Sequence, residues 1–388
     1  MTSDSSKGLL PAGLSDDLPP EADIEAETVT ALMATFRAHG YERVKPPLIE
    51  FEESLLEGPG ATLGQQLFRV MDPQSQRMLG LRADMTVQVA RIAATRLGGR
   101  PRPLRLSYAG QVLRTRGSQL RPERQFSQAG FELIGSDSLG ADTEAILLAA
   151  EALRGAGANN LSIDLTVPHL VGVLAAEAGI DGERLAQLRD ALDRKDAAAL
   201  ATVSGQNGID FQRLLEIGGP AEKALAGLKA MNLPAAGAAI VASVEALVAR
   251  AVPHLDGLLL TLDPTEYRGF EYHTGISFSV FARGVRGELG RGGRYGLPGG
   301  EPATGFSVYL DSLRRALPKQ RNGDRVFIAA SAEFGVARKL HEEGWRTVRG
   351  LSSDADAMAE ATRLGCTHIL RDGTVQALGD TTQKSEKD

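Results

Sequence analysis

The spacing of apolar residues divides the first third of the chain into short strands and longer helices. A first helix is expected to begin near Pro20, because Asp16 and Asp17 can cap it and proline suits a first turn, and to end at Gly40. Compact or alternating apolar runs predict strands, and a period near 3.6 residues predicts further helices. Strands are expected at 41–50, 66–71, 78–81, 104–109, 128–134 and 161–165, and helices at 86–97 and 142–154.

A long helical pattern occupies the middle of the chain. It runs from about 171 to 252 and is interrupted at Gly179, at 218–220 and at Pro234. Strands return at 258–262 and 275–281. Antiparallel strands mixed with helices, without strict alternation, indicate an α+β core over residues 1–320, with residues 171–252 as a helical insertion.

The last part of the chain has a different pattern. Strand and helix segments alternate from residue 325, with strands expected at 326–330, 345–348 and 367–370 and helices at 333–343 and 354–364. This alternation predicts a small α/β domain over 321–379. The polar residues 380–388 are expected to be disordered.

Composition places the chain among ordinary globular proteins. It has 388 residues, 43% of them hydrophobic, and a formal net charge of -6, which argues against a general nucleic-acid binder. Cys366 is the only cysteine, so a disulfide framework and a cysteine-based zinc site are excluded. The N-terminal residues do not resemble a signal peptide, and the apolar run 235–252 contains Glu245 and Arg250, so we expect a core helix, no membrane span and a cytoplasmic location.

Candidate chemistry begins with the segment 304–313, which follows Gly-Gly-Arg-Tyr at 292–295. Together they resemble the third signature motif of class II aminoacyl-tRNA synthetases, in its histidyl-tRNA synthetase form. The resemblance implies an arginine that binds the ATP triphosphate and a glycine that leaves room beside the nucleotide. Ser312 and Tyr309 hold these two places. A hydroxyl cannot replace the planar fork of guanidinium donors, and a tyrosine ring fills space, so we expect the scaffold to be kept and ATP use to be lost.

Two earlier segments carry the same resemblance. Residues 40–50 resemble the first class II motif, which builds a dimer interface, although any helix-to-strand turn would look similar. The segment Leu81-Arg-Ala-Asp-Met-Thr places Asp84 and Thr86 where the family holds the amino group of histidine. Asp84 has a second interpretation, as a cap of the following helix, and the two roles are compatible.

The second class II motif is expected between 108 and 135. Arg114 matches the arginine that contacts the substrate carboxylate and the α-phosphate, whereas Arg116 stands where the family has a glutamate. Phe126 matches the ring that stacks on adenine. Arg121 and Arg124 fall in the loop between, where basic residues are typical of a solvated surface.

Strand alternation gives this motif a polar face. Gln128, Gly130 and Glu132 share one face of the predicted strand, and the resemblance implies that Gln128 and Glu132 bind histidine. A buried Gln and Glu without partners would each cost about 1–3 kcal/mol, which favours a polar ligand over a plain core.

The segment 266–275 resembles the histidine-specific signature of the synthetases. Arg268 matches a catalytic arginine, Tyr272 matches the first ligand-contacting tyrosine, and Glu271 and His273 replace an Asp and the second Tyr. An isolated histidine is more often structural, but the position of His273 within the motif makes a binding role equally plausible. The histidine-binding set implied by the resemblance is therefore Asp84, Thr86, Arg114, Gln128, Glu132, Arg268, Tyr272 and His273.

The form of the 81–91 segment is more similar still to the synthetase paralogues that serve as regulatory subunits of ATP phosphoribosyltransferase in histidine biosynthesis. The resemblance implies a class II synthetase-like antiparallel sheet flanked by helices, and a homodimer. It also implies association with the short-form catalytic subunit and feedback inhibition by L-histidine. We expect no catalysis, no cofactor, no metal and no tRNA. Two alternatives stay open: a divergent active histidyl-tRNA synthetase, and an interaction scaffold without a ligand.

Overall fold

The computed structural model describes residues 8–118, 121–204, 209–267, 269, 272–318, 324–352 and 356–379. The chain divides into two compact units, Met1–Pro318 and Lys319–Asp388. The expected disordered segment 380–388 lies outside the described residues.

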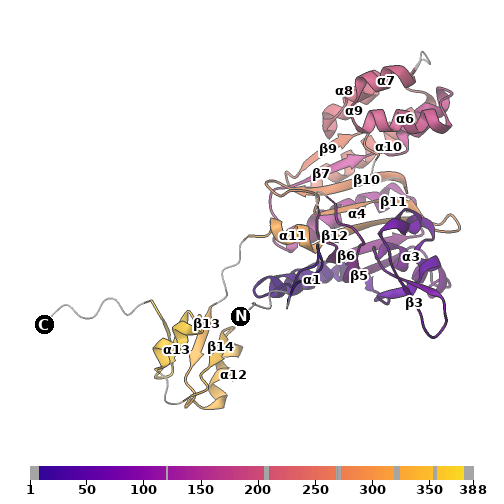
Figure 1. Cartoon of the computed structure of the whole chain (residues 1–388). Helices are drawn as coiled ribbons and strands as arrows, with labels where there is room; N and C mark the ends of the chain where they lie inside the picture. The colour runs from indigo at the N-terminus through magenta and orange to yellow at the C-terminus, as the bar shows by residue number, and fades with distance from the viewer. Residues whose placement is uncertain are drawn as a thin grey trace, which may run out of the picture. The chain divides into compact units, whose positions relative to one another are not determined.

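A large mixed sheet forms the centre of the first unit (Figure 1). Among the described residues it has nine strands in the order β1-β5-β6-β12-β11-β10-β7-β9-β8, with parallel pairing of β1 with β5 and of β7 with β9 and antiparallel pairing elsewhere. The strands are β1 Glu42–Arg43, β5 Leu104–Leu113, β6 Gln125–Ile134, β7 Leu161–Thr166, β8 Gly219–Pro220, β9 Leu259–Asp263, β10 His273–Ala282, β11 Gly290–Gly296 and β12 Pro302–Tyr309.

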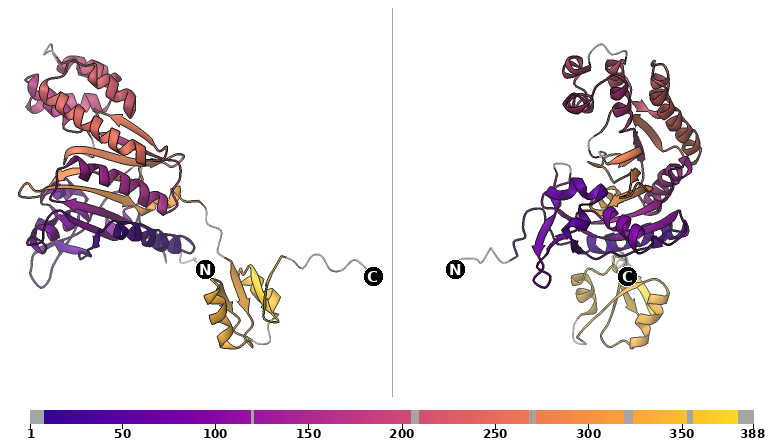
Figure 2. Two further views of the ribbon diagram at one scale, coloured as in Figure 1. Left: turned by 180° about the vertical axis from the view of Figure 1, so that it is seen from behind. Right: turned by 90° about the vertical axis from the view of Figure 1, so that its right-hand side faces the viewer.

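Helices cover the two faces of this sheet with separate hydrophobic cores. On one face, Leu32 and Phe36 of one helix pack with Phe131 of β6; on the other, Met85 and Val89 pack with Tyr108 of β5. The helices of these layers are α1 Glu21–Ala38, α3 Thr86–Thr95, α4 Leu139–Gly155 and α11 Leu310–Ala316. Because β6 alternates, its odd residues Ala129 and Phe131 belong to the first core and its even residues Phe126 and Ile134 to the second. Seen from behind, α1 and α4 lie side by side over one face of the sheet (Figure 2).

A small second sheet lies beside α3. It has the order β2-β4-β3, with both pairs antiparallel. Two short helical segments connect β2 to β3. Its elements are β2 Ile49–Phe51, α2 Glu52–Leu55, η1 Gly58–Gln66, β3 Phe68–Met71 and β4 Met78–Leu81.

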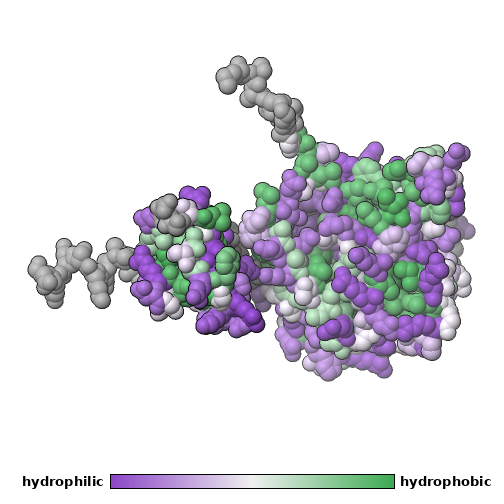
Figure 3. All heavy atoms as spheres, turned by 90° about the horizontal axis from the view of Figure 1, so that it is seen from below, coloured by the Kyte–Doolittle hydropathy of each residue, from purple (hydrophilic) through white to green (hydrophobic). Residues whose placement is uncertain are grey.

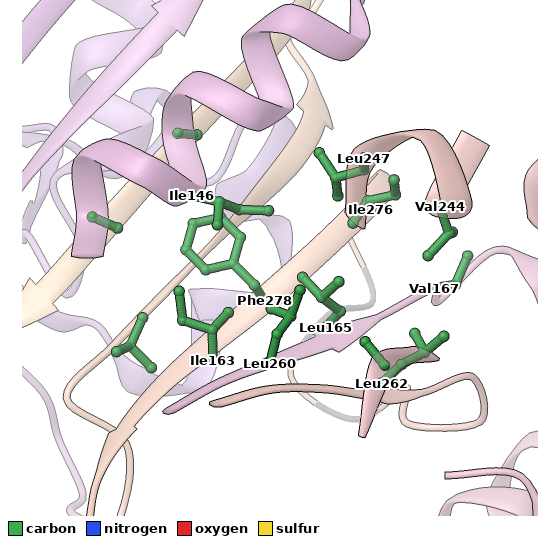
Figure 4. Close-up of a cluster of buried hydrophobic side chains, with 14 of the residues drawn as sticks. Ile146, Ile163, Leu165, Val167, Val244, Leu247, Leu260, Leu262, Ile276 and Phe278 are labelled. Carbon is green, nitrogen blue, oxygen red and sulfur yellow. The ribbon is translucent and has the colours of Figure 1, made fainter. Parts of the chain in front are cut away.

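The helical insertion shares the core of the large sheet. Side chains of β7, β9 and β10 meet Ile146 of α4 and Val244 and Leu247 of the last insertion helix (Figure 4). The insertion comprises α5 Leu170–Glu177, α6 Gly182–Asp193, α7 Ala197–Ser204, α8 Phe211–Glu216, α9 Ala221–Lys229, α10 Ala235–Ala251 and η2 Val252–His254. It is therefore packed against the sheet rather than held on a linker.

The segment Ala235–His254 is long and apolar enough to cross a membrane, judged by length and composition alone, so the expectation that it is too polar for this was wrong. One such helix is weak evidence of a span, because core helices pass the same test. Here Val241, Val244 and Leu247 of α10 belong to the buried core.

The second unit has a four-stranded sheet in the order β14-β13-β15-β16, in which β13 is parallel to β14 and β15, and β16 is antiparallel to β15. Its elements are β13 Arg325–Ile328, α12 Phe334–Glu342, β14 Arg346–Arg349, α13 Ala357–Arg363, β15 His368–Arg371 and β16 Thr374–Ala377.

The predicted fold class is confirmed, with two local corrections. The expected strand 41–50 is split into β1 and β2, because Pro46 and Pro47 have no N–H for a ladder and their carbonyls bind the Arg82 guanidinium instead. The middle segment is not helical throughout, since β8 adds an edge strand to the sheet at Gly219–Pro220.

Candidate functional site

A cavity of about 540 Å³ opens on the α3 face of the large sheet. Its wall combines acidic, basic, hydroxyl and aromatic side chains from segments far apart in sequence. The lining residues are Leu63, Gln66, Asp84, Arg114, Ser118, Arg121, Gly269, Tyr272, Gly287, Glu288, Arg291, Tyr309 and Ser312.

The predicted histidine-binding residues divide into two groups. Asp84, Arg114 and Tyr272 line the cavity, and we call this part the histidine side. Four others, Thr86, Gln128, Glu132 and His273, are buried and do not line it. Arg268 lies outside the described residues, as does Glu271.

Asp84 lies just before α3 and at the cavity wall, the two places that its two interpretations require. Its Oδ1 accepts a hydrogen bond of 2.8 Å from the Thr86 N–H, the first of α3, although Met85 holds the N-cap position itself. Its Oδ2 accepts from the Gln128 Nε2 at 3.2 Å. The carboxylate is thereby held in one orientation at the cavity wall.

Gln128 acts as a brace behind this wall. The side chain is 1% exposed, its Oε1 accepts from the Met85 N–H at 2.9 Å, and its Nε2 also donates to the Ser307 Oγ at 2.8 Å. Its hydrogen-bonding groups are therefore used within the protein, and through one of them it orients Asp84 at the cavity wall.

Glu132 is buried deeper in the same network. Its carboxylate accepts from the Tyr108 hydroxyl at 3.1 Å and the Tyr295 hydroxyl at 2.8 Å. Burial raises the pKa of the Glu132 carboxyl to about 8, although the hydrogen bonds from Tyr295 and Tyr108 act to lower it. Tyr108 in turn is hydrogen-bonded to Ser307 at 2.8 Å and to Thr86 at 3.2 Å.

The prediction that Gln128, Gly130 and Glu132 share a face agrees with this arrangement. A Cβ on Gly130 would lie 2.5 Å from the Tyr108 hydroxyl oxygen, so the glycine makes room for the ring between its two polar neighbours. Sequence reasoning missed the partners Tyr108, Tyr295 and Ser307. Tyr295 stands within the Gly-Gly-Arg-Tyr motif, which was the available signal.

Aromatic rings close the histidine side. The Tyr272 ring lies 4.1 Å from the His273 ring and 6.0 Å from the Tyr295 ring, measured between centroids. Burial, with the Asp84 carboxylate as a second cause, raises the pKa of the Tyr272 hydroxyl well above its usual value, so it stays a hydrogen-bond donor.

Arg114 supplies the positive charge on this side. Its Nε donates to the Ala83 carbonyl at 3.3 Å, and its guanidinium carbon lies 5.1 Å from the centre of the Phe126 ring. Its terminal nitrogens have no acceptor among the described residues, which leaves them free for a carboxylate in the cavity.

The opposite part of the cavity, which we call the nucleotide side, comprises Arg121, Glu288, Tyr309 and Ser312. The Arg121 guanidinium lies 3.7 Å from the Tyr309 ring centre and 5.2 Å from that of Phe126. The interpretation of Arg121 as a solvated loop residue is wrong, because its side chain is only 11% exposed.

Charges on the nucleotide side are paired with one another. Arg121 lies 3.3 Å from Asp311 and 3.8 Å from Glu288, and Arg291 lies 2.7 Å from Glu288. Burial raises the pKa of the Asp311 carboxyl, and Arg121 acts to lower it. These guanidinium groups are therefore engaged by the protein itself.

The positions expected to hold ATP are unsuited to it. Ser312 is 1% exposed, and its Oγ accepts from the Arg315 guanidinium at 3.1 Å. Phe126 is 4% exposed and meets the Tyr309 ring edge to face at 5.9 Å, so no face is open for adenine. Arg116 is exposed and does not line the cavity. Among the described residues, no cluster of His, Cys, Asp or Glu suits a metal ion.

Comparisons with known proteins agree with this description. The histidyl-tRNA synthetase family model matches residues 13–313. The chain is 55% identical to an ATP phosphoribosyltransferase regulatory subunit of Paramagnetospirillum magneticum over 97% of this chain and 100% of that protein, and 48% identical to one of Rhodospirillum rubrum over 95% and 96%.

Solved structures show the same fold. A Bacillus halodurans structure described as an ATP phosphoribosyltransferase regulatory subunit/histidyl-tRNA synthetase superposes with a TM-score of 0.78 at 26% identity, covering 92% of this chain and 96% of that one. Histidyl-tRNA synthetase of Nostoc also gives 0.78, at 17% identity over 96% and 95%, which is a likeness of fold alone.

Proposed function

The chain belongs to the family of ATP phosphoribosyltransferase regulatory subunits and carries a histidyl-tRNA synthetase family domain. From this premise we propose that it is a non-catalytic subunit that binds L-histidine. In this proposal it associates with a short-form catalytic subunit of ATP phosphoribosyltransferase, is required for its activity in the first step of histidine biosynthesis, and mediates its feedback inhibition. Its site of action is the cytoplasm.

One observation carries the proposal: one cavity has polar groups that stay open on one side and charged groups that pair with one another on the other side. The histidine side presents a carboxylate for an ammonium group (Asp84), a guanidinium for a carboxylate (Arg114) and a hydroxyl (Tyr272). On the nucleotide side, Arg121 stacks on the Tyr309 ring and its charge is paired with Asp311. A free amino acid fits this arrangement better than an amino acid together with ATP.

Feedback inhibition in this proposal depends on a difference in histidine affinity between two states of the assembly. Histidine inhibits only if it binds the low-activity state of the assembly more tightly than the active state, because equal affinity shifts no population. A difference of about 1–3 kcal/mol between the two states is enough for useful inhibition.

We also propose that two copies associate through the segment around residues 40–50. A hollow of about 670 Å³ there is lined by Val29, Met33 and Tyr41 among others. Leu48 and Ile49 nearby are 45% and 41% exposed. Apolar side chains gather in patches on the face of the first unit that is seen from below (Figure 3), and exposed apolar area of this kind favours a protein interface.

The test is reconstitution with a short-form catalytic subunit. We expect the two proteins to co-elute and the formation of phosphoribosyl-ATP to rise when this chain is added, and L-histidine to suppress that rise. Asp84→Asn is expected to keep the stimulation and lose the suppression. If the proteins do not associate and the rate is unchanged, the regulatory function is refuted.

An active histidyl-tRNA synthetase is the second candidate, and the retained Arg114 and Asp84 favour it. Histidine-dependent exchange between ATP and pyrophosphate separates the two. We expect no exchange, because the guanidinium groups of the nucleotide side are already paired with Asp311 and Glu288. Measurable turnover would replace the regulatory function with the synthetase.

A further inference from the structure

Arg124 joins the N-terminal segment of the chain to Arg114, which lines the cavity. Its N–H donates to the Gly13 carbonyl at 2.7 Å, and its Nη1 donates to the Ala12 carbonyl at 3.0 Å. Further along this segment, Asp17 pairs with Arg314 of α11 at 2.6 Å. The segment 11–17 is thus attached to the core at both ends.

The same arginine holds the backbone of Arg114. The Arg114 N–H donates to the Arg124 carbonyl at 2.7 Å, and the Arg124 Nε donates to the Arg114 carbonyl at 3.2 Å. The Arg124 guanidinium also lies 5.1 Å from the Phe68 ring centre. The backbone N–H and the backbone carbonyl of Arg114 are therefore both bonded to Arg124. Arg114 is the residue whose guanidinium is open on the histidine side.

Gly13 is required for this contact. Its φ is +78°, a conformation that side chains disfavour, and a Cβ there would lie 2.8 Å from the Arg124 side chain and 2.9 Å from the Pro122 carbonyl oxygen. A larger residue would displace the segment from Arg124. Gly8 offers a comparison, because its φ is +103° but a Cβ there meets no atom within 4 Å.

We propose that Arg124 is a positioning residue that, held by the N-terminal segment 11–17, fixes Arg114 for the carboxylate of the bound amino acid. This inference rests on the proposed histidine function. Arg124 itself does not line the cavity. It acts by keeping the backbone of Arg114 in place, so that the terminal guanidinium nitrogens meet the ligand without further reorganisation.

Loss of this support for Arg114 is expected to affect only the binding of the ligand's carboxylate. Loosening Arg114 weakens the hold on the carboxylate but leaves Asp84 and Tyr272 as they are. Histidine and histidinol share the ammonium and the imidazole, and histidinol has an alcohol in place of the carboxylate. Loss of the Arg124 side chain is therefore expected to reduce histidine affinity roughly tenfold, as for one hydrogen-bonded contact. Histidinol affinity is expected to change less than about twofold.

The experiment is a calorimetric titration of the full chain with L-histidine and with L-histidinol. The variants are Arg124→Ala, Arg124→Lys and Gly13→Ala, with the lysine expected to retain part of the affinity. Arg154→Ala and Gly8→Ala are the matched controls. Arg154 also donates to a backbone carbonyl, that of Leu255, but it is remote from the cavity. Both controls are expected to bind like the wild type, and thermal unfolding confirms that each variant is folded.

The outcomes are distinct. A loss confined to histidine in Arg124→Ala and Gly13→Ala supports the inference. An equal loss for both ligands, or no loss for either, overturns it while leaving the histidine function intact. A wild-type chain that binds neither ligand overturns the proposed function, and this inference with it.

Discussion

The two sides of the cavity differ in where their polar groups find partners. On the histidine side, buried partners orient Asp84, while Arg114 and Tyr272 remain open to the cavity. On the nucleotide side, Arg121, Asp311, Glu288 and Arg291 pair with one another. The same scaffold thus keeps one side prepared for a ligand and uses the other for its own packing. In the function that we propose, this difference lets a synthetase-like domain bind an amino acid without activating it.

The largest expected effect concerns the buried carboxyl behind the histidine side. The pKa of Glu132 is raised from its usual value to about 8, so the folded protein keeps a proton that the unfolded chain releases above its ordinary carboxyl pKa. Stability from this proton is present in full at low pH and is lost as pH rises toward 8. Compared with Glu132→Gln, the wild type is expected to lose roughly 4 kcal/mol of unfolding free energy between pH 5 and pH 8.

Urea unfolding of both proteins at pH 5, 6.5 and 8 measures this difference. Subtracting the unfolding free energy of Glu132→Gln from that of the wild type cancels the titration of the other groups, because only residue 132 changes. If this difference in unfolding free energy stays constant over the pH range, Glu132 is ionised throughout and the network is already charged.

The nucleotide side is expected to contribute to stability and not to binding. Arg121→Ala leaves the Asp311 carboxylate buried with only Arg315, 3.7 Å away, and should reduce the unfolding free energy by about 3 kcal/mol. Histidine affinity is expected to change less than about twofold. Denaturant unfolding and calorimetry on the same samples separate the two effects.

A double variant sharpens this result. In Arg121→Ala/Asp311→Ala, both charges are gone, so part of the lost stability should return relative to the single variants, with a coupling of about 1–3 kcal/mol. A large loss of histidine affinity in Arg121→Ala would break the comparison, because it would place Arg121 in the binding site.

Asp84→Asn tests the histidine side. Asparagine keeps an oxygen that can accept from the Thr86 N–H while the negative charge is removed, but its amide nitrogen cannot accept from the Gln128 Nε2. Histidine affinity is expected to fall by roughly a hundredfold, or about 3 kcal/mol, with the unfolding free energy lowered by about 1 kcal/mol. If affinity is unchanged, Asp84 serves only the local structure at Thr86 and Gln128.

The smallest effect is expected at Ser312. Ser312→Ala removes the acceptor of the Arg315 hydrogen bond, which should cost about 1 kcal/mol or less and leave histidine affinity unchanged. Thermal unfolding and calorimetry measure the two quantities. A clear change in histidine affinity would mean that the nucleotide side still takes part in binding.

Much of the fold could be predicted because its signals are local. The end of α1 before Gly40 and the strand β4 follow from local signals over a few residues. The cap expected from Asp16 or Asp17 was wrong, because Pro20 holds the N-cap position without a side-chain cap and Asp17 pairs with Arg314. The strands β11 and β12 were treated as a motif and not as strands. Glycines at 290, 292, 293 and 305 weaken the strand pattern there, and they are needed because neighbouring backbone and rings come within 3 Å of where a Cβ would lie.

The site could be predicted only in part. The shared face of Gln128 and Glu132 follows from a two-residue period, and the replaced Tyr309 and Ser312 can be read from the motif. The partners of these residues are not local. Glu132 meets Tyr295, 163 positions away, and Gln128 meets Ser307, 179 positions away. Arg121 was misjudged for the same reason, since its partner Asp311 comes from the other end of the domain.

A calorimetric titration of the chain with L-histidine, repeated in the presence of ATP and Mg²⁺, tests the division of the cavity directly. We expect saturable histidine binding with an affinity that ATP does not change, because Asp84, Arg114 and Tyr272 are open to the cavity whereas Arg121 is paired with Asp311 and stacked on Tyr309. An absence of histidine binding, or binding strengthened by ATP, would show that the cavity is not divided in this way.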